Sequence, residues 1–261
     1  MNLIIEQAVK QLWEADNNKE PIAPLTEMYP NLTLEDAYAI QKQVQAWKLD
    51  SGSRVIGHKI GLTSKAMQNA LGVPEPDFGS LFDDTLLPEG SFVDYQQFLQ
   101  PKVEAELAFV MKHDLKGPGV HFHDVIRATD YIVPAFEIID SRIRNWEIKI
   151  QDTVADNASY GALVLGSHGI RVSDLDLRTI GLVLEQNGEV IDTAAGAAVL
   201  GHPGAAVAWL CNKLAAFGEG LKAGDIVLSG SFTKAYEAKP GDVYTAHFGG
   251  VGSVQVGFKE R

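Results

Sequence analysis

The chain is poor in cysteine and in long apolar runs, and each shortage excludes a class of protein. Cys211 is the only cysteine among 261 residues, so no intrachain disulfide can form. This fits a reducing compartment such as the cytoplasm. Cys211 lies in an apolar stretch, which predicts a small buried side chain rather than a nucleophile. No stretch approaches the roughly 18 apolar residues of a membrane span, and residues 1–12 lack the apolar core of a signal peptide.

Basic residues are also scarce, which narrows the choice of partners. The sequence has 22 lysines and arginines against 34 aspartates and glutamates, for a net charge of −12. Nucleic acids and anionic membranes are recognised by basic surfaces, so neither is expected as a partner. An acidic surface also repels small anionic substrates at long range. A site for such substrates would therefore need local cations or a metal ion.

Nucleotide-binding patterns are missing as well. Residues 249–253 are glycine-rich, but no helix is predicted after them, which argues against a dinucleotide site. Residues 228–233 lack the Gly-Lys-Ser/Thr sequence of a phosphate loop. Their hydroxyl and backbone N–H groups suit either an anion cradle or an ordinary turn.

The hydrophobic patterns divide the chain into a helical start and a mostly β remainder. Residues 2–15 and 34–49 are predicted to be helices, the second of them capped by Thr33. From residue 54 onward, short strands alternate with turns. We expect an α+β fold with a helical N-terminal part, residues 1–53, and a mixed β domain, residues 54–261.

Three glutamates form the most informative chemical pattern. Glu104 and Glu106 alternate with apolar residues over 101–111, as in a β-strand whose two carboxylates point the same way. Glu137 lies in residues 131–140, an apolar run typical of a strand buried on both faces. If the two strands are neighbours, three carboxylates converge. A hard divalent ion such as Mg²⁺ or Mn²⁺ would then compensate their mutual repulsion.

Two other interpretations of these acids stay open. Glu104 and Glu106 could form a solvated strand face, since glutamate is rarely buried. Glu137 could instead form a structural ion pair, because a lone buried carboxylate is costly. The candidate cations are Arg142, Arg144 and Lys59.

Further polar residues could contribute chemistry. Lys59, in a glycine-bounded strand, is either a cation or proton shuttle for a site, or a surface lysine. Asp77 is predicted to lie in a turn-rich loop that could hold an acid in a fixed pose. Residues 152–159 are dense in short polar side chains and could be a ligand loop or a helix cap. His121 and His123 have metal-like spacing, but capping or surface roles are favoured.

Six motifs follow one another along nearly the whole chain. They are GHKIGLTSK (57–65), PDFG (76–79), EAE (104–106), PAFEIIDSR (134–142), DTVADNAS (152–159) and GDIVLSGS (224–231). In this order they resemble the hydratase/decarboxylase branch of the fumarylacetoacetate hydrolase superfamily. The resemblance implies a mixed β-sandwich roll with a small helical or α/β N-terminal part.

The resemblance also implies a complete site. Three acids would hold Mg²⁺ or Mn²⁺, two residues would move protons and two serines would bind the substrate. On this sequence they are Glu104, Glu106 and Glu137 for the metal, Lys59 and Asp77 for catalysis, and Ser159 and Ser231 for the substrate. Members of the branch form homo-oligomers, and the hydratase and decarboxylase of one pathway can associate.

The implied activity is metal-dependent hydration of 2-hydroxypenta-2,4-dienoate to 4-hydroxy-2-oxopentanoate, in meta-cleavage degradation of aromatic compounds. Two sibling activities stay open: decarboxylation of 4-oxalocrotonate and hydration of 2-oxohept-4-ene-1,7-dioate. A dicarboxylate needs a second cationic subsite, for which Arg142, Arg144 and Lys65 are candidates. A non-catalytic partner subunit is the remaining alternative. It would be expected to have lost part of the acid triad, and all three acids are present.

Overall fold

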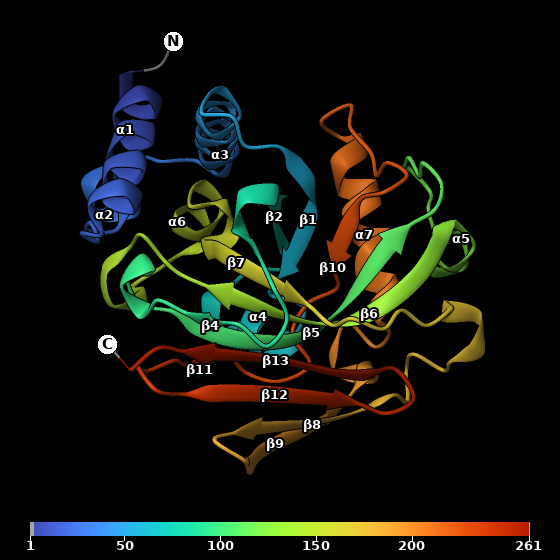
Figure 1. Cartoon of the computed structure of the whole chain (residues 1–261). Helices are drawn as coiled ribbons and strands as arrows, with labels where there is room; N and C mark the ends of the chain where they lie inside the picture. Colours follow the sequence, from blue (N-terminus) through green and yellow to red (C-terminus); the bar gives the residue numbers. More distant parts are fainter. Residues whose placement is uncertain (1–2, 261) are drawn as a thin grey trace.

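The computed structural model describes residues 3–260, and its first part is a layer of helices (Figure 1). The Thr33 hydroxyl accepts from the Asp36 N–H, and the Asp36 carboxylate accepts from the Thr33 N–H. The predicted cap is therefore confirmed, and so is the predicted α+β class. The helices of this layer are α1 (Leu3–Asn18), α2 (Leu25–Met28) and α3 (Leu34–Asp50).

The helical layer packs on α6 (Ile150–Ala155), which belongs to the rest of the chain. Leu12 of α1, Ile40 of α3 and Val154 of α6 are buried in one apolar cluster. The layer therefore covers the segment that carries the 152–159 motif. The division of the chain after residue 53 remains a prediction.

The larger of two β-sheets has eight strands in the order β2-β1-β10-β5-β6-β7-β3, with β11 paired to β5. β5 and β6, which carry the three glutamates, are long antiparallel neighbours near its centre, so the condition for the glutamates to converge is met. The strands are β1 (Val55–Gly61), β2 (Asp77–Phe82), β3 (Leu86–Leu87), β5 (Lys102–Met111), β6 (Thr129–Ile139), β7 (Tyr160–Leu165), β10 (Ile226–Leu228) and β11 (Tyr236–Glu237).

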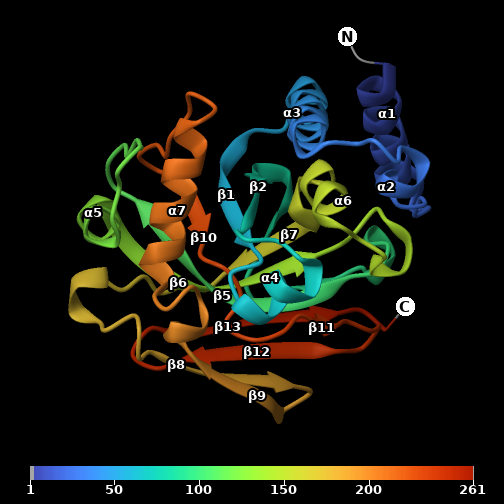
Figure 2. The same cartoon turned by 180° about the vertical axis from the view of Figure 1, so that it is seen from behind.

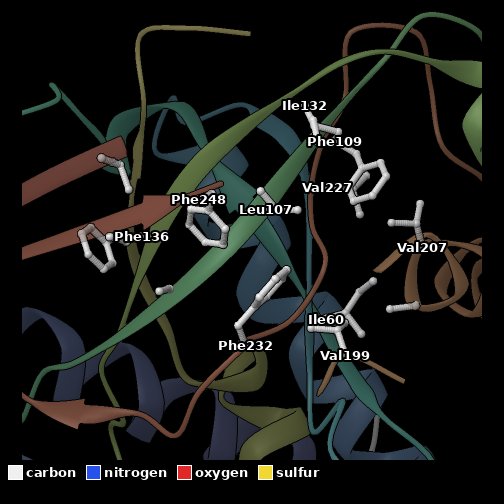
Figure 3. Close-up of a cluster of buried hydrophobic side chains, with 14 of the residues drawn as sticks. Ile60, Leu107, Phe109, Ile132, Phe136, Val199, Val207, Val227, Phe232 and Phe248 are labelled. Atoms are coloured by element: carbon white, nitrogen blue, oxygen red, sulfur yellow. The ribbon is translucent and has the colours of Figure 1, made fainter. Parts of the chain in front are cut away.

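The smaller sheet lies below the larger one in the view of Figure 1. It has five strands in the order β4-β13-β12-β8-β9. Apolar side chains fill the space between the sheets, and Figure 3 labels Phe136 of β6, Phe232 and Phe248 of β12 among them. The rings of Phe232 and Phe248 meet edge to face at 5.2 Å between centroids. The strands are β4 (Phe92–Val93), β8 (Gly181–Gln186), β9 (Glu189–Ala195), β12 (Val243–Phe248) and β13 (Gly252–Phe258).

The remaining helices flank the larger sheet. Figure 2 shows α7 beside α5, on the side away from the N-terminal layer. Cys211 of α7 is buried, as predicted. Within residues 3–260, no helix combines the length and the apolar character needed to span a bilayer. These helices are α4 (Lys65–Leu71), α5 (Phe122–Ala128) and α7 (Pro203–Ala215); short 3₁₀ turns cover Asp83–Thr85, Tyr95–Gln97, Arg144–Trp146, Asn157–Ser159, Val172–Asp174 and Gly196–Ala198.

The prediction of a turn-rich loop around Asp77 is wrong. Asp77 begins β2, where every residue is buried, and it pairs with Gly61 of β1. Pro74 and Pro76 give the stretch the composition of a loop, but both precede the strand. Asp77 is therefore held by a sheet rather than by a turn.

Candidate metal centre

The antiparallel register of β5 and β6 brings the three glutamates together. Glu104 lies directly opposite Glu137, and Glu106 is two residues along the same face of β5. Each residue offers one carboxylate oxygen such that all three oxygens lie within 4.8 Å of one another. The alternative of a solvated strand face is wrong for Glu106, which is 0% exposed, whereas Glu104 is half-buried.

The glutamate oxygens are incompletely satisfied by the protein. The backbone N–H of Gly230 donates to Glu106 Oε2 at 2.7 Å. Glu106 Oε1 and Glu137 Oε2 are buried and accept no hydrogen bond from residues 3–260. Buried acceptors without donors are rare in folded proteins. A set of carboxylate oxygens left in this state fits a hard divalent cation. The segment after β10 thus directs its Gly230 N–H at an acid rather than at a free anion.

The electrostatics of the cluster also favour a divalent cation that would compensate the repulsion between the carboxylates. Burial raises the pKa of Glu106 well above its ordinary value, and the neighbouring Glu137 and Glu104 carboxylates raise it further. Burial also raises the pKa of Glu137 to about 8, although Lys59 opposes the shift. One lysine cannot neutralise three acids. The cluster must therefore hold protons or bind additional positive charge.

Lys59 is the cation that the fold supplies. It is 3% exposed, so the alternative of a surface lysine is wrong. Its Nζ lies 3.1 Å from Glu137 Oε1 and donates to the Ala158 carbonyl at 2.9 Å. Burial opposes the charge, but the carboxylates of Glu137 and Asp77 outweigh it and raise the pKa of Lys59. Lys59 is thus a buried, protonated ammonium group.

Asp77 lies beside Lys59 across Gly61. Its Oδ2 accepts from the Thr153 hydroxyl at 3.1 Å, while its buried Oδ1 has no hydrogen-bond partner in the described chain. A Cβ atom built on Gly61 would lie 2.2 Å from Asp77 Oδ1 and 3.3 Å from Lys59 Nζ. Only glycine leaves this space open. Burial raises the pKa of the Asp77 carboxyl, partly opposed by Lys59.

A cavity of about 270 Å³ adjoins the cluster. Five of the seven predicted site residues line it, and Glu106 and Glu137 lie buried next to them. Ser159 donates to Asp156 Oδ2 at 3.3 Å, whereas the buried hydroxyl of Ser231 has no partner among residues 3–260. The predicted residues in its wall are Lys59, Asp77, Glu104, Ser159 and Ser231.

The cavity wall also contains residues that the sequence interpretation missed. Lys102 Nζ lies 4.2 Å from the centroid of the Trp146 ring, and Lys234 also lines the cavity. Lys102 could have been found, because it precedes Glu104 by two residues and so shares its strand face. Lys234 follows β10 in an irregular segment and gave no such signal.

The lysine and arginines proposed as a second cationic subsite do not line this cavity. The Lys65 ammonium donates to Gln68 Oε1 at 2.8 Å, and Arg144 forms exposed pairs with Glu27 and Glu147. Arg142 lines a separate cavity of about 190 Å³ against α1 and α3. Each nitrogen of its guanidinium donates either to Asp156 or to the Tyr160 carbonyl. Of the three cations proposed for Glu137, only Lys59 pairs with it.

The remaining motifs have separate places. Residues 152–159 serve both as a cap and as cavity wall: Asp152 Oδ2 accepts from the Lys149 N–H, and Ala158 faces the cavity with Ser159. His121 precedes α5, where the Asp124 carboxylate accepts from its backbone N–H. The preference for a capping position over a metal pair is therefore confirmed for His121.

The chain is similar over almost its whole length to known hydratases and to a decarboxylase. Residues 55–259 match the fumarylacetoacetate (FAA) hydrolase C-terminal family. The 2-keto-4-pentenoate hydratase of Paraburkholderia xenovorans (strain LB400) is 46% identical over 256 residues, covering 98% of this chain and 95% of the relative. The 2-oxo-hept-4-ene-1,7-dioate hydratase of Escherichia coli is 42% identical over 255 residues, covering 95% and 96%. The solved 4-oxalocrotonate decarboxylase of Pseudomonas putida G7, complexed with magnesium and adipate, has a TM-score of 0.95 at 40% identity and covers 97% of each chain.

Proposed function

Because this chain belongs to the fumarylacetoacetate hydrolase C-terminal family, we propose that it is a lyase that hydrates 2-hydroxypenta-2,4-dienoate to 4-hydroxy-2-oxopentanoate. The observation that carries the proposal is the convergence of Glu104, Glu106 and Glu137 beside Lys59 and Asp77. Relatives that share more than 40% identity over almost the whole chain are named as hydratases of this kind. The pathway role would be meta-cleavage degradation of aromatic compounds.

The three glutamates would hold one divalent ion, Mg²⁺ or Mn²⁺. Their unpartnered buried oxygens are the hard ligands that such ions prefer. When bound, the ion supplies Lewis-acid stabilisation of the enolate form of a 2-oxo acid. A relative 40% identical has been solved with magnesium, which supports a divalent metal without fixing which ion this chain uses.

Lys59 and Asp77 would move the protons. The reaction takes a proton from the 2-hydroxyl and delivers one to C5, and water then adds its oxygen to C4 and a proton to C3. Lys59 is a protonated donor at the cavity wall, held by two acceptors. Asp77 offers an unpartnered Oδ1 that can accept a proton from water. Ser159 would bind substrate, and Ser231 would donate to its carboxylate end.

A second candidate is an activity on a dicarboxylate, either hydration of 2-oxohept-4-ene-1,7-dioate or decarboxylation of 4-oxalocrotonate. Lys102 and Lys234 favour it, because both line the cavity and neither forms an ion pair within residues 3–260. These two lysines replace Arg142, Arg144 and Lys65 as the candidate second subsite. The adipate in the decarboxylase relative is a dicarboxylate as well. A non-catalytic partner subunit fits less well, since the acid cluster is intact.

We further propose a homo-oligomer in the cytoplasm that can associate with the sibling enzyme of its pathway. The single cysteine fits a reducing compartment. Size-exclusion chromatography with light scattering, alone and with the sibling enzyme, tests the assembly.

A substrate panel tests the function. The purified protein is mixed with each of the three dienol or oxo-acid substrates, with Mg²⁺ or Mn²⁺ and then with chelator, while ultraviolet absorbance and products are followed. We expect metal-dependent loss of 2-hydroxypentadienoate with 4-hydroxy-2-oxopentanoate as product. Inertness there together with carbon dioxide release from 4-oxalocrotonate would establish the decarboxylase instead. If the protein is inert to every substrate, the non-catalytic partner subunit is the remaining alternative.

A further inference from the structure

Three consecutive residues beside the cavity have a left-handed backbone. Asn157, Ala158 and Ser159 have φ values of 53°, 52° and 53°. A side chain at such a φ crowds the following carbonyl, so non-glycine residues adopt it rarely and almost never in a row. Such strain persists only where the surrounding structure holds it, and it is concentrated at functional sites.

The side chain of Asn157 ties this turn to β2, while the Asp140 N–H donates to the Ser159 carbonyl at its other end at 2.7 Å. Its Oδ1 accepts from the Ser80 N–H at 2.8 Å, and its Nδ2 donates to the Ser80 carbonyl at 2.9 Å. One amide thus pairs with both backbone groups of a single residue on β2, the last strand at that edge of the sheet. Gly79 makes the approach possible, because a Cβ there would lie 2.3 Å from the Asn157 carbonyl oxygen.

The turn presents one group to Lys59. The carbonyl of Ala158, at its centre, accepts from Lys59 Nζ at 2.9 Å. Glu137 Oε1 lies 3.1 Å from the same nitrogen. An ammonium group has three protons in tetrahedral positions. Two fixed acceptors therefore fix the direction of the third proton, and Lys59 lines the cavity.

We propose that Asn157 is a positioning residue for Lys59. By pairing with the backbone of Ser80 it maintains the left-handed turn, and the turn keeps the Ala158 carbonyl on the ammonium group, so that one proton of Lys59 stays directed into the cavity. The kinetic consequence rests on the proposed proton-transfer role of Lys59, whereas the geometric consequence does not.

The test compares Asn157→Ala with Asn187→Ala. Asn187 is a matched control: it also has a left-handed φ, of 56°, and its amide also bonds to backbone and side-chain groups of a neighbouring segment, at Val243 and Asp242. It lies in the β8–β9 hairpin of the other sheet. We expect Asn157→Ala to lower kcat by on the order of 10–100-fold, the cost of a small misplacement of a reacting group, with little change in KM. Asn187→Ala should lower the melting temperature but keep kcat.

Two further measurements separate positioning from general damage. The affinity for Mn²⁺ alone, by titration calorimetry, should be unchanged in Asn157→Ala, because the glutamates are untouched. Adding Ala158→Gly to Asn157→Ala should restore part of kcat, since glycine accepts a left-handed φ without strain. Three results would each overturn the proposal. They are an unchanged kcat in Asn157→Ala, a loss of both Mn²⁺ binding and activity in that variant, and no recovery of kcat when Ala158→Gly is added.

A readout without turnover keeps the inference distinct from the proposed function. In lysine-selective ¹⁵N NMR, an ammonium held by two acceptors exchanges its protons slowly, and Lys59→Met identifies its signal. We expect this signal in the wild type and in Asn187→Ala, and its loss by fast exchange in Asn157→Ala. If the wild type turns over none of the three substrates, the proposed function fails. If the Lys59 signal is the same in Asn157→Ala as in the wild type, the positioning role fails.

Discussion

At the scale of single residues, the site contains more acidic side chains than basic ones. Three glutamates and Asp77 surround one lysine, and all of these residues except the half-buried Glu104 are buried. A buried carboxylate is stable only when paired, protonated or bound to a cation. Lys59 accounts for one of these charges, through Glu137. The acids that remain are what make this site responsive to a divalent ion.

Glu106→Gln tests that charge balance. The amide keeps the shape of the side chain but removes the charge of a residue that is 0% exposed. We expect the affinity for Mn²⁺ to fall by at least the ~10–100-fold that loss of a residue supporting a metal ligand costs, with metal-dependent turnover abolished. Without metal at neutral pH, the variant should melt at a higher temperature than the wild type, because folding no longer has to bury the Glu106 carboxylate or make it take up a proton.

The matched control is Glu189→Gln, which removes the same charge at an exposed position of β9. It should change neither the Mn²⁺ affinity, measured by titration calorimetry, nor the turnover, measured by the loss of dienol absorbance. Full activity in Glu106→Gln would contradict the metal assignment.

At the scale of elements, β1 and β2 bring the proton-carrying residues together. Lys59 pairs with Gly79, and Gly61 with Asp77, in one antiparallel register. The sequence predicted Lys59 on a glycine-bounded strand, but the prolines before Asp77 concealed that β2 begins there. Local composition does not predict which distant segments of a chain pair as neighbouring strands. The same reason kept Lys234, which lies between strands, outside the sequence prediction.

Gly61→Ala tests the close approach of these two strands. The added methyl would meet Asp77 Oδ1 at 2.2 Å and crowd Lys59 Nζ. We expect kcat to fall by on the order of 100-fold through displacement of these groups, while Mn²⁺ affinity changes little. The matched control is Gly181→Ala at the start of β8, where a Cβ meets nothing within 4 Å. Equal kinetics of both variants would show that the space at Gly61 has no role.

His58, also on β1, gives the fold a pH dependence. Burial lowers the pKa of its imidazole, partly opposed by the Asp225 and Glu219 carboxylates. A base whose pKa is lowered by folding binds fewer protons in the folded state. Its contribution to stability is therefore present above the unfolded pKa of ~6.5 and is lost as pH falls below that value.

Urea unfolding between pH 5 and pH 8 measures the free energy of unfolding at each pH. One histidine can change this free energy by at most ~1.4 kcal/mol per pH unit, the slope for binding one proton. His58→Leu should lose this part of the slope, and His168→Gln, at an exposed position, should keep it. A wild-type slope preserved in His58→Leu would assign the pH dependence to other groups.

At the scale of the whole molecule, the sequence predicted the α+β class, which follows from periodicity. It predicted the convergence of the glutamates only on the condition that their two strands are neighbours. Alternation placed Glu104 and Glu106 on one face, and an apolar run placed Glu137 in a buried strand. The cavity as a whole could not be predicted, since its wall combines β1, β2, β5, the 157–159 turn and the segment after β10. Those segments are far apart in the chain and meet only through sheet order and through the packing of α6 under the helical layer.

The metal site should therefore contribute to the stability of the entire fold. Its glutamates lie on β5 and β6 near the centre of the larger sheet, so unfolding destroys the site. An ion that binds only the folded chain stabilises it by ~2.7 kcal/mol at 100 times its dissociation constant. For a chain of 261 residues this corresponds to a rise in melting temperature of roughly 5–10 °C. Differential scanning calorimetry with Mn²⁺ and then with chelator measures the shift. Glu106→Gln should show almost none of it, whereas Glu189→Gln should show all of it. An equal shift in Glu106→Gln would mean that the ion stabilises the protein from a different site, and the three converging glutamates would then need another explanation.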